Sequence, residues 1–206
     1  MKDTVYILIA FVIGIILGYF VDIPAAKEET LPLVILCGIL FLVGMSVGSD
    51  SKTIRAILNL RVELLLLPAM SIIGSLIGTL VATLVLREMG VFAGLAIGSG
   101  LGYYSASSVI IGDILGPSLA AAALFSNVLR EVSTLILAPL VAKNFGPLAT
   151  ISCGGANTSD VVLPVILRNC GEEYAVPCIY NGIACTFSVP FCVSFFCAQQ
   201  LALSGI

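Results

Sequence analysis

Long apolar runs separated by short polar stretches set the elements predicted for this chain. A helix crosses the hydrocarbon core of a membrane with about 17–25 predominantly apolar residues. Five runs satisfy this length without interruption, and we expect transmembrane helices at Thr4–Phe20, Leu31–Gly48, Val62–Leu86, Ser118–Ala142 and Tyr174–Cys197. The stretches between the runs are short, so residues 1–206 are expected to form a single membrane-embedded domain.

Two further apolar segments, Val91–Ile111 and Pro147–Leu167, are each interrupted by glycines and polar residues. The glycines at these interruptions, which we expect to be unwound or to act as hinges, are Gly100, Gly102, Gly154 and Gly155. Unpaired backbone groups are tolerated at membrane depth only where the chain is buried in protein or lines a wet cavity. A pair of such segments is typical of a transporter binding site, although two ordinary surface turns would leave a similar pattern.

The predicted fold class is therefore all-α and polytopic, with about five continuous transmembrane helices and two broken or re-entrant segments. Composition agrees, because 59% of the residues are hydrophobic and 10% are charged, against about 25% in soluble domains. The formal net charge of −3 gives no reason to expect a nucleic-acid partner. Histidine is absent, which removes Ser-His catalysis and histidine-metal sites. We expect no enzyme, no cofactor and no metal centre, apart from a possible Na⁺ at Asp160.

Small residues predict how the helices pack. Cys178, Cys185 and Cys192 recur every seven residues without a Cys-x-x-Cys pair, which favours packing at a helix interface. Glycines four residues apart let helix backbones approach closely in lipid. Such spacing occurs at Gly14/Gly18, Gly44/Gly48 and Gly74/Gly78, and along Gly90, Gly94, Gly98 and Gly102.

Basic residues near the predicted spans indicate orientation, because cytoplasmic loops are enriched in Lys and Arg. The loop after the second span carries Lys52, Arg55 and Arg61 and is expected to be cytoplasmic. The N-terminus is then cytoplasmic and the C-terminus external, in a multi-pass protein of the cytoplasmic (inner) membrane. Lys143 fits the cytoplasmic side better if the first broken segment re-enters the membrane.

Charged residues in the middle of a predicted span are the candidates for binding. Burying a charge at that depth is costly, so such residues face a cavity or a partner. Arg130 and Glu131 are adjacent and point about 100° apart on a helix, whereas Asn127 shares the face of Glu131. We expect Glu131 and Asn127 to line a site and Arg130 to meet another anion, Asp160 or Asp113; a buried structural ion pair is the alternative.

Asp160 is the strongest single candidate. It follows an interruption whose unwound carbonyls attract cations, and its carboxylate could bind a cation or exchange a proton. Polar neighbours that we expect to contribute to the same site are Asn157, Thr158 and Ser159 in the second interruption and Tyr103 and Ser105 in the first. Two carboxylates, Glu131 and Asp160, suit a cationic substrate, a coupling H⁺ or Na⁺, or both in exchange.

Three elements resemble the LysO-type lysine exporters. In chain order they are ILFLVGMSVGSD, GSGLGYYSASSVIIGDILGPSLAAAALFSNVLREVSTLILAPLV and GGANTSDVVLP, which is the order that the family has, and together they cover most of the chain from Leu31 onward. The resemblance implies export of L-lysine and its analogue thialysine across the inner membrane. It also implies that Glu131 and Asp160 are functional and reachable from the external side.

The chain departs from the family pattern in three places. Asn157-Thr158-Ser159 stands where Thr-Ser-Met is usual before the Asp, and Tyr103 stands where Trp is common. Single-chain members resemble this sequence plus an N-terminal unit of about three helices, which some members make as a separate small membrane protein. The resemblance therefore implies a partner subunit or a homo-oligomer.

Three functions remain open on the sequence. The leading one is a secondary active exporter and antiporter of lysine or a similar cationic amino acid, driven by H⁺ or Na⁺. A passive channel for a cationic solute would use the same polar interruptions without coupling. An accessory subunit of a two-component transporter would have no transport of its own. No nucleotide-binding Gly-x-x-x-x-Gly-Lys-Ser/Thr motif is present, so the chain is not expected to hydrolyse ATP.

Overall fold

The computed structural model describes residues 62–86 and 89–204, together with four isolated positions, Val34, Gly38, Phe41 and Met45. The chain divides into two compact units, residues 1–40 and 41–206, and the elements below all belong to the second. The first span predicted from the sequence lies outside the described residues, and so does the second apart from the isolated positions, which are helical.

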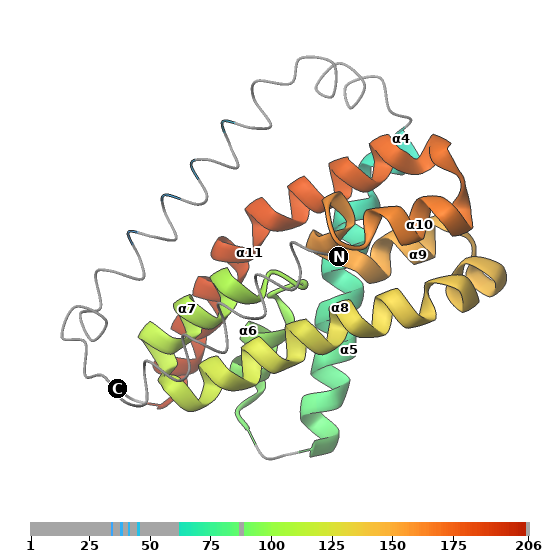
Figure 1. Ribbon diagram of the computed structural model, residues 1–206. Helices are drawn as coiled ribbons and strands as arrows, with labels where there is room; N and C mark the ends of the chain where they lie inside the picture. The colour runs from blue at the N-terminus through green and yellow to red at the C-terminus, as the bar shows by residue number, and fades with distance from the viewer. Residues whose placement is uncertain are drawn as a thin grey trace, which may run out of the picture. The chain divides into compact units, whose positions relative to one another are not determined.

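Every element within residues 62–86 and 89–204 is helical, which agrees with an all-α fold (Figure 1). In chain order the elements are α4 Val62–Leu65, α5 Leu67–Leu86, α6 Val91–Gly98, α7 Tyr104–Leu115, α8 Pro117–Phe145, α9 Pro147–Gly154, the 3₁₀ helix η2 Gly155–Ser159, α10 Leu163–Cys170, the 3₁₀ helix η3 Glu172–Tyr174, and α11 Ala175–Ser204. Three stretches of the described chain are long and apolar enough to cross a membrane, Leu67–Val85, Pro117–Phe145 and Glu172–Leu203. They are candidate spans by length and composition, and they coincide with the last three continuous spans predicted from the sequence.

The order short helix, non-helical or 3₁₀ segment, short helix, long helix occurs twice, first as α6, α7 and α8 and then as α9, η2, α10 and α11. Each of α8 and α9 starts with a proline that follows a glycine of positive φ, Gly116 or Gly146, so the preceding helix ends sharply. In Figure 1, α6 and α7 lie toward the end where α8 begins, whereas α9 and α10 lie toward the end where α8 stops. The chain direction of α8 is opposite to that of α11.

Helices α5 and α6 meet through the predicted glycine spacing. A Cβ at Gly94 would lie 2.2 Å from Oγ1 of Thr83, and one at Gly98 would lie 2.0 Å from Oγ1 of Thr79. Only hydrogen therefore fits at these positions, which confirms their packing role. A Cβ at Gly78 would meet nothing within 4 Å among the described residues, and the same holds for Gly74. The pairs Gly14/Gly18 and Gly44/Gly48 lie outside the described residues.

Cysteines pack along α11 as predicted. Cys178 and Cys185 are fully buried and Cys192 is partly buried, and all three are free thiols. In the portion that the structure describes, no three His, Cys, Asp or Glu side chains are grouped in a way that would hold a metal ion. These cysteines therefore act as small packing residues.

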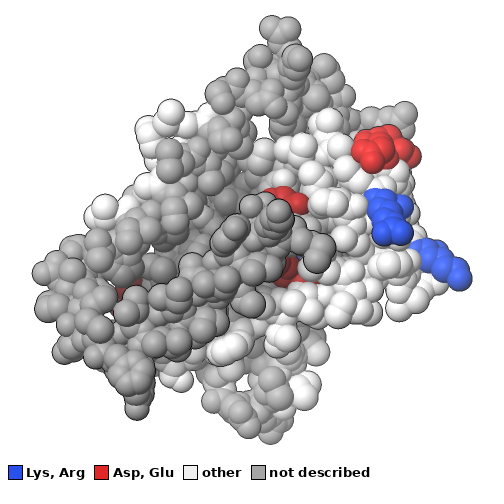
Figure 2. Space-filling view, viewed as in Figure 1, with Lys and Arg blue, Asp and Glu red and all other residues white. Residues whose placement is uncertain are grey.

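Apolar side chains cover much of the outer surface of the long helices. In the most apolar 18-residue stretch of α5, only 17% is buried inside the protein, and the share is the same in α8. Such exposure suits helices that contact lipid. Charged side chains instead gather where α8 and α10 end (Figure 2). The residues there are Lys143, Arg168, Glu172 and Glu173.

Candidate functional site: two breaks in contact

Residues 99–103 form the first break, between α6 and α7, and the break is held by an asparagine of α8. Leu101 and Gly102 have positive φ values of 51° and 95°, which turn the backbone out of a right-handed helix. Asn127 Oδ1 accepts the Gly102 N–H at 2.8 Å, and its Nδ2 lies 3.3 Å from the Ile97 carbonyl oxygen. Asn127 is only 3% exposed. Its side chain therefore replaces hydrogen bonds that an unbroken helix would have made.

The second break, η2 and the residues after it, is held in the same way by an asparagine of α11. Asn181 Nδ2 donates to the Gly155 carbonyl at 3.1 Å and to Thr158 Oγ1 at 3.2 Å, while its Oδ1 accepts the Ser71 hydroxyl of α5 at 3.1 Å. Sequence reasoning missed Asn181 and Ser71. A comparison of the two repeated halves would have found Asn181, which follows Gly155 by 26 residues as Asn127 follows Gly102 by 25.

The two breaks contact each other directly. The Ala156 N–H donates to the Leu101 carbonyl at 2.9 Å, and a Cβ at Gly155 would lie 2.3 Å from that same oxygen. Gly155 also has a positive φ of 59°, so two independent requirements select glycine there. A Cβ at Gly102 would in turn lie 3.1 Å from Asn157 Nδ2. The two interruptions predicted from the sequence are thus adjacent in space.

Both candidate carboxylates lie beside the second break. Glu131, one turn after Asn127 on α8, accepts a hydrogen bond from Asn157 Nδ2 at 2.8 Å. Asp160 ends η2, is exposed, and accepts the Val161 N–H with its own Oδ1. Glu131 and Asp160 are near enough to interact electrostatically when both are ionised, and Tyr104 at the start of α7 is near both. This arrangement concentrates negative charge at a place where a cation would relieve the repulsion.

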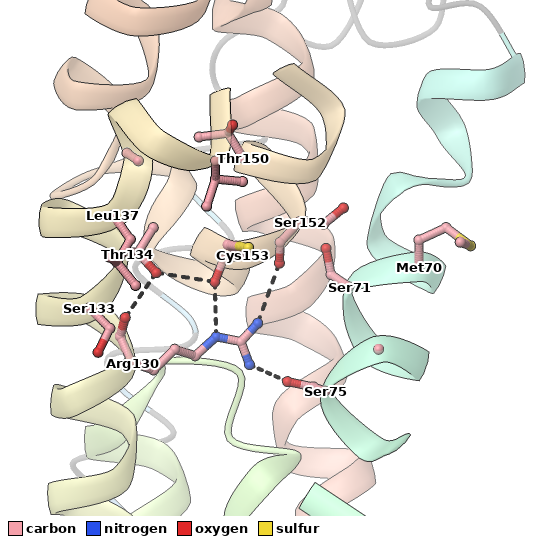
Figure 3. Close-up of a pocket in the computed structure, with 13 residues that line it drawn as sticks. Met70, Ser71, Ser75, Arg130, Ser133, Thr134, Leu137, Thr150, Ser152 and Cys153 are labelled. Atoms are coloured by element: carbon pink, nitrogen blue, oxygen red, sulfur yellow. Dashed lines mark hydrogen bonds between the residues drawn. The ribbon is translucent and has the colours of Figure 1, made fainter. Parts of the chain in front are cut away.

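Arg130 does not meet the anion expected from the sequence. Its Nε donates to the Cys153 carbonyl at 3.1 Å, Nη2 to the Ser152 carbonyl at 3.4 Å, and Nη1 to the Ser75 hydroxyl, and no ion pair with Asp160 or Asp113 is found among the described residues (Figure 3). The physical reason is the end of α9. The last carbonyls of a helix lack intrahelical partners and carry its negative dipole end, so they attract the guanidinium.

The remaining predicted residues differ in how far a ligand could reach them. Thr158 is fully buried and donates to the Gly155 and Cys178 carbonyls, whereas Ser159 donates to the Ala156 carbonyl and packs against Gly182. Tyr103 and Ser105 are partly exposed at the start of α7, near each other. Within the described residues, no buried side-chain nitrogen or oxygen lacks a hydrogen-bond partner. The buried polar residues therefore support the breaks, and the reachable groups are the two carboxylates, Tyr103, Tyr104 and Ser105.

Comparison with known proteins shows which family the chain belongs to. The sequence model described as "Lysine exporter LysO" matches residues 8–197, most of the chain. This chain belongs to the lysine exporter LysO family. The lysine exporter LysO of Escherichia coli (strain K12) is 30% identical over 194 residues, which are 93% of this chain and 62% of that protein. A putative lysine exporter of Haemophilus influenzae is 30% identical over 190 residues, which are 92% of this chain and 96% of that protein.

Family membership confirms the resemblance based on the three sequence elements, all of which lie within the matched residues. The chain spans about three fifths of the length of the E. coli relative (62%), so what that longer protein does is not carried over whole. No solved structure matches the chain.

Proposed function

We propose that this chain is a secondary active exporter of L-lysine and analogues such as thialysine across the cytoplasmic membrane. Two relatives carry the name lysine exporter or putative lysine exporter, and the chain has helices that suit a membrane. The observation that carries the proposal is the pair of contacting breaks with Glu131 and Asp160 beside them. In this proposal α6–α7 and α9–α10 are discontinuous helices that enter the membrane and place the breaks within it.

The cation binds between the two carboxylates. Asn157 fixes the orientation of Glu131 by donating to its Oε2, while Asp160 is exposed and open to a ligand. An ammonium group presents three donors and a positive charge, so it can bridge two carboxylates that otherwise repel each other. When the substrate leaves, H⁺ or Na⁺ takes its place, and this exchange couples export to an ion gradient. Tyr103 and Ser105 are further contacts in this proposal.

Movement of the breaks opens the site alternately to the two sides. The contact between the breaks includes one backbone hydrogen bond, Ala156 N–H to the Leu101 carbonyl, with glycines on both sides of the contact. Asn127 and Asn181 instead attach each break to its own long helix. Rocking of one helix group against the other would break the hydrogen bond between the two breaks. The bonds by which Asn127 and Asn181 hold each break would remain. Either a small three-helix membrane subunit or a second copy of the chain completes the transporter.

Flux measurements in liposomes test this function. The chain is reconstituted alone and together with any small membrane protein encoded beside it, and labelled L-lysine flux is followed under an imposed pH or Na⁺ gradient. Asp160→Asn and Glu131→Gln each remove one charged contact to the cation, worth about 1.5–3 kcal/mol, so flux should fall about tenfold or more. Glu172→Gln, which removes an exposed carboxylate in η3, is the matched control and should leave flux unchanged.

Each alternative predicts a different result. Lysine flux that ignores both gradients would contradict coupling and favour a passive channel. Flux only in the presence of the second protein, with no effect of either carboxylate substitution, would indicate an accessory subunit. No lysine flux in either preparation would refute lysine as the substrate.

A further inference from the structure

A pocket of about 400 Å³ lies between α5, α8 and α9, on the side of the second break where Arg130 points. This volume is within the range of sites that bind small molecules. Its lining includes Ser71 and Ser75 of α5, Arg130 and Thr134 of α8, and Ser152 and Cys153 of α9 (Figure 3). Among the described lining residues Arg130 is the one charged side chain, and none is acidic.

The guanidinium of Arg130 keeps donors available for a ligand. An arginine side chain has five N–H donors, two on each terminal nitrogen. One donor on each of Nε, Nη1 and Nη2 is used, by the Cys153 carbonyl, the Ser75 hydroxyl and the Ser152 carbonyl. One N–H on each terminal nitrogen therefore has no partner in the part of the chain described. The carbonyls at the end of α9 supply only partial negative charge, about half an elementary charge for a whole helix terminus.

An anion in the pocket would supply the full negative charge that the carbonyls at the end of α9 do not supply to Arg130. Two N–H groups on a planar guanidinium match the two oxygens of a carboxylate, which is the geometry that arginine recognises best. The Ser75 hydroxyl, already bonded to Nη1, adds a polar group on the same wall. A diamine has no oxygen acceptor and would gain none of these contacts, and a neutral acceptor would gain hydrogen bonds without the pairing of opposite charges.

The pocket is also next to the carboxylate site. A Cβ at Gly155 would lie 3.2 Å from Nη2 of Arg130, and two residues later Asn157 donates to Glu131. The same short segment of the second break thus has a positive group near Gly155 and a negative group bonded to Asn157. A cationic amino acid carries both of the complementary charges, an ammonium on its side chain and a carboxylate on its Cα.

We propose that the Arg130 pocket binds a free carboxylate and that it selects exporter substrates that are amino acids, excluding diamines. Carboxylate binding is inferred from the pocket alone, whereas the selection of exporter substrates rests on the proposed lysine export. It follows that lysine binds, whereas cadaverine, which is lysine without its carboxylate, does not bind in this pocket.

Protection of Cys153 from alkylation measures binding without any transport. Cys153 is exposed and lines the pocket, so a chain in which Cys37, Cys170 and Cys192 are replaced by serine reports on it. N-ethylmaleimide, which is uncharged, is the probe. Lysine at about ten times its Kd should slow alkylation about tenfold, because about a tenth of the sites remain empty. Acetate should protect at higher concentration, and cadaverine should not protect.

Arg130→Gln should abolish protection by lysine and acetate, whereas Arg168→Gln, which changes an exposed arginine at the end of α10, should keep it. Equal protection by cadaverine and lysine in the unsubstituted chain would refute the inference even if Arg130→Gln failed to fold. Acetate protection without any lysine flux would support the anion pocket and refute lysine export. If lysine and cadaverine were transported equally well, the proposed lysine export would stand, but the role of the pocket in selecting substrates would be refuted.

Discussion

At the scale of single residues, asparagine side chains determine the shape of the candidate site. Asn127 and Asn181 each pair with backbone groups that a break leaves without helical partners. An asparagine amide suits this task because it is both a donor and an acceptor and remains uncharged. Asn127 was expected to line a site with Glu131; its amide is instead occupied by the first break, and Glu131 interacts with the second break through Asn157.

Asn127→Ala should destabilise the protein more than an equivalent change elsewhere. The substitution leaves the buried Gly102 N–H and Ile97 carbonyl without the Asn127 amide as a partner. Each lost partner costs about 1–3 kcal/mol of folding free energy. Thermal unfolding in detergent micelles measures the effect. Asn169→Ala is the control, because Asn169 is exposed and, within the described residues, bonds only the Val165 carbonyl of its own helix. Equal melting temperatures for the two variants would contradict the role of Asn127.

At the scale of elements, the short helices are positioned by close backbone contacts. Helix α6 is only eight residues long, Val91–Gly98, too short to be stable alone. It is placed by threonines of α5 against Gly94 and Gly98, and by the Gln200 side chain of α11, which accepts the Ala93 N–H at 3.1 Å. These contacts decide where the first break begins.

Substituting a glycine inside this contact and a glycine outside it should change the stability in opposite directions. Gly94→Ala would place a Cβ 2.2 Å from Thr83 Oγ1, and such overpacking costs about 1–3 kcal/mol. Gly78→Ala meets nothing within 4 Å among the described residues and should gain up to about 1 kcal/mol of helix propensity. Thermal unfolding of both variants tests this. A melting temperature for Gly94→Ala at or above that of the parent would refute close packing of α5 on α6.

At the scale of the whole molecule, chain direction and charge together indicate an orientation. The first part of α11 contacts α4 and the start of α5, where the Tyr180 hydroxyl donates to the Leu65 carbonyl and the Ser71 hydroxyl donates to Asn181 Oδ1. Helix α8 runs in the direction opposite to that of α11 (Figure 1). Lys143 and Arg168 lie in the last turns of α8 and α10, where charged side chains gather (Figure 2). We expect from these charges that the short segments re-enter the membrane and that the Lys143 end of α8 lies in the cytoplasm.

Labelling of introduced cysteines in intact cells tests this orientation. Lys143→Cys and Arg168→Cys should resist a membrane-impermeant thiol reagent added outside and react after permeabilisation. Ser118→Cys, at the other end of α8, should react from outside. The parent chain gives the background from its own thiols. Labelling of positions 118 and 143 from the same side would show that α8 does not cross the membrane.

Much of the candidate site could be predicted from residue chemistry. Costly charges and glycines in apolar segments identified Glu131, Asp160 and both breaks, because lipid leaves few reasons for such residues to be there. The partner of Arg130 was predicted wrongly, since sequence spacing favours side-chain anions and does not show where helix α9 ends. Asn181 was missed because a single asparagine in an apolar helix gives no signal without the repeat that pairs it with Asn127.

The sequence by itself determined the all-α class, the three described apolar helices, the places where helices are interrupted and the family, because each depends on local composition or on short motifs. Only the tertiary structure decided that the two breaks contact each other, that each is attached to a long helix by an asparagine, and that Arg130 bonds the end of α9 while Glu131 bonds Asn157 of the second break. Those relations join residues far apart in the chain. They arise from helix packing, which brings together groups that no local pattern connects.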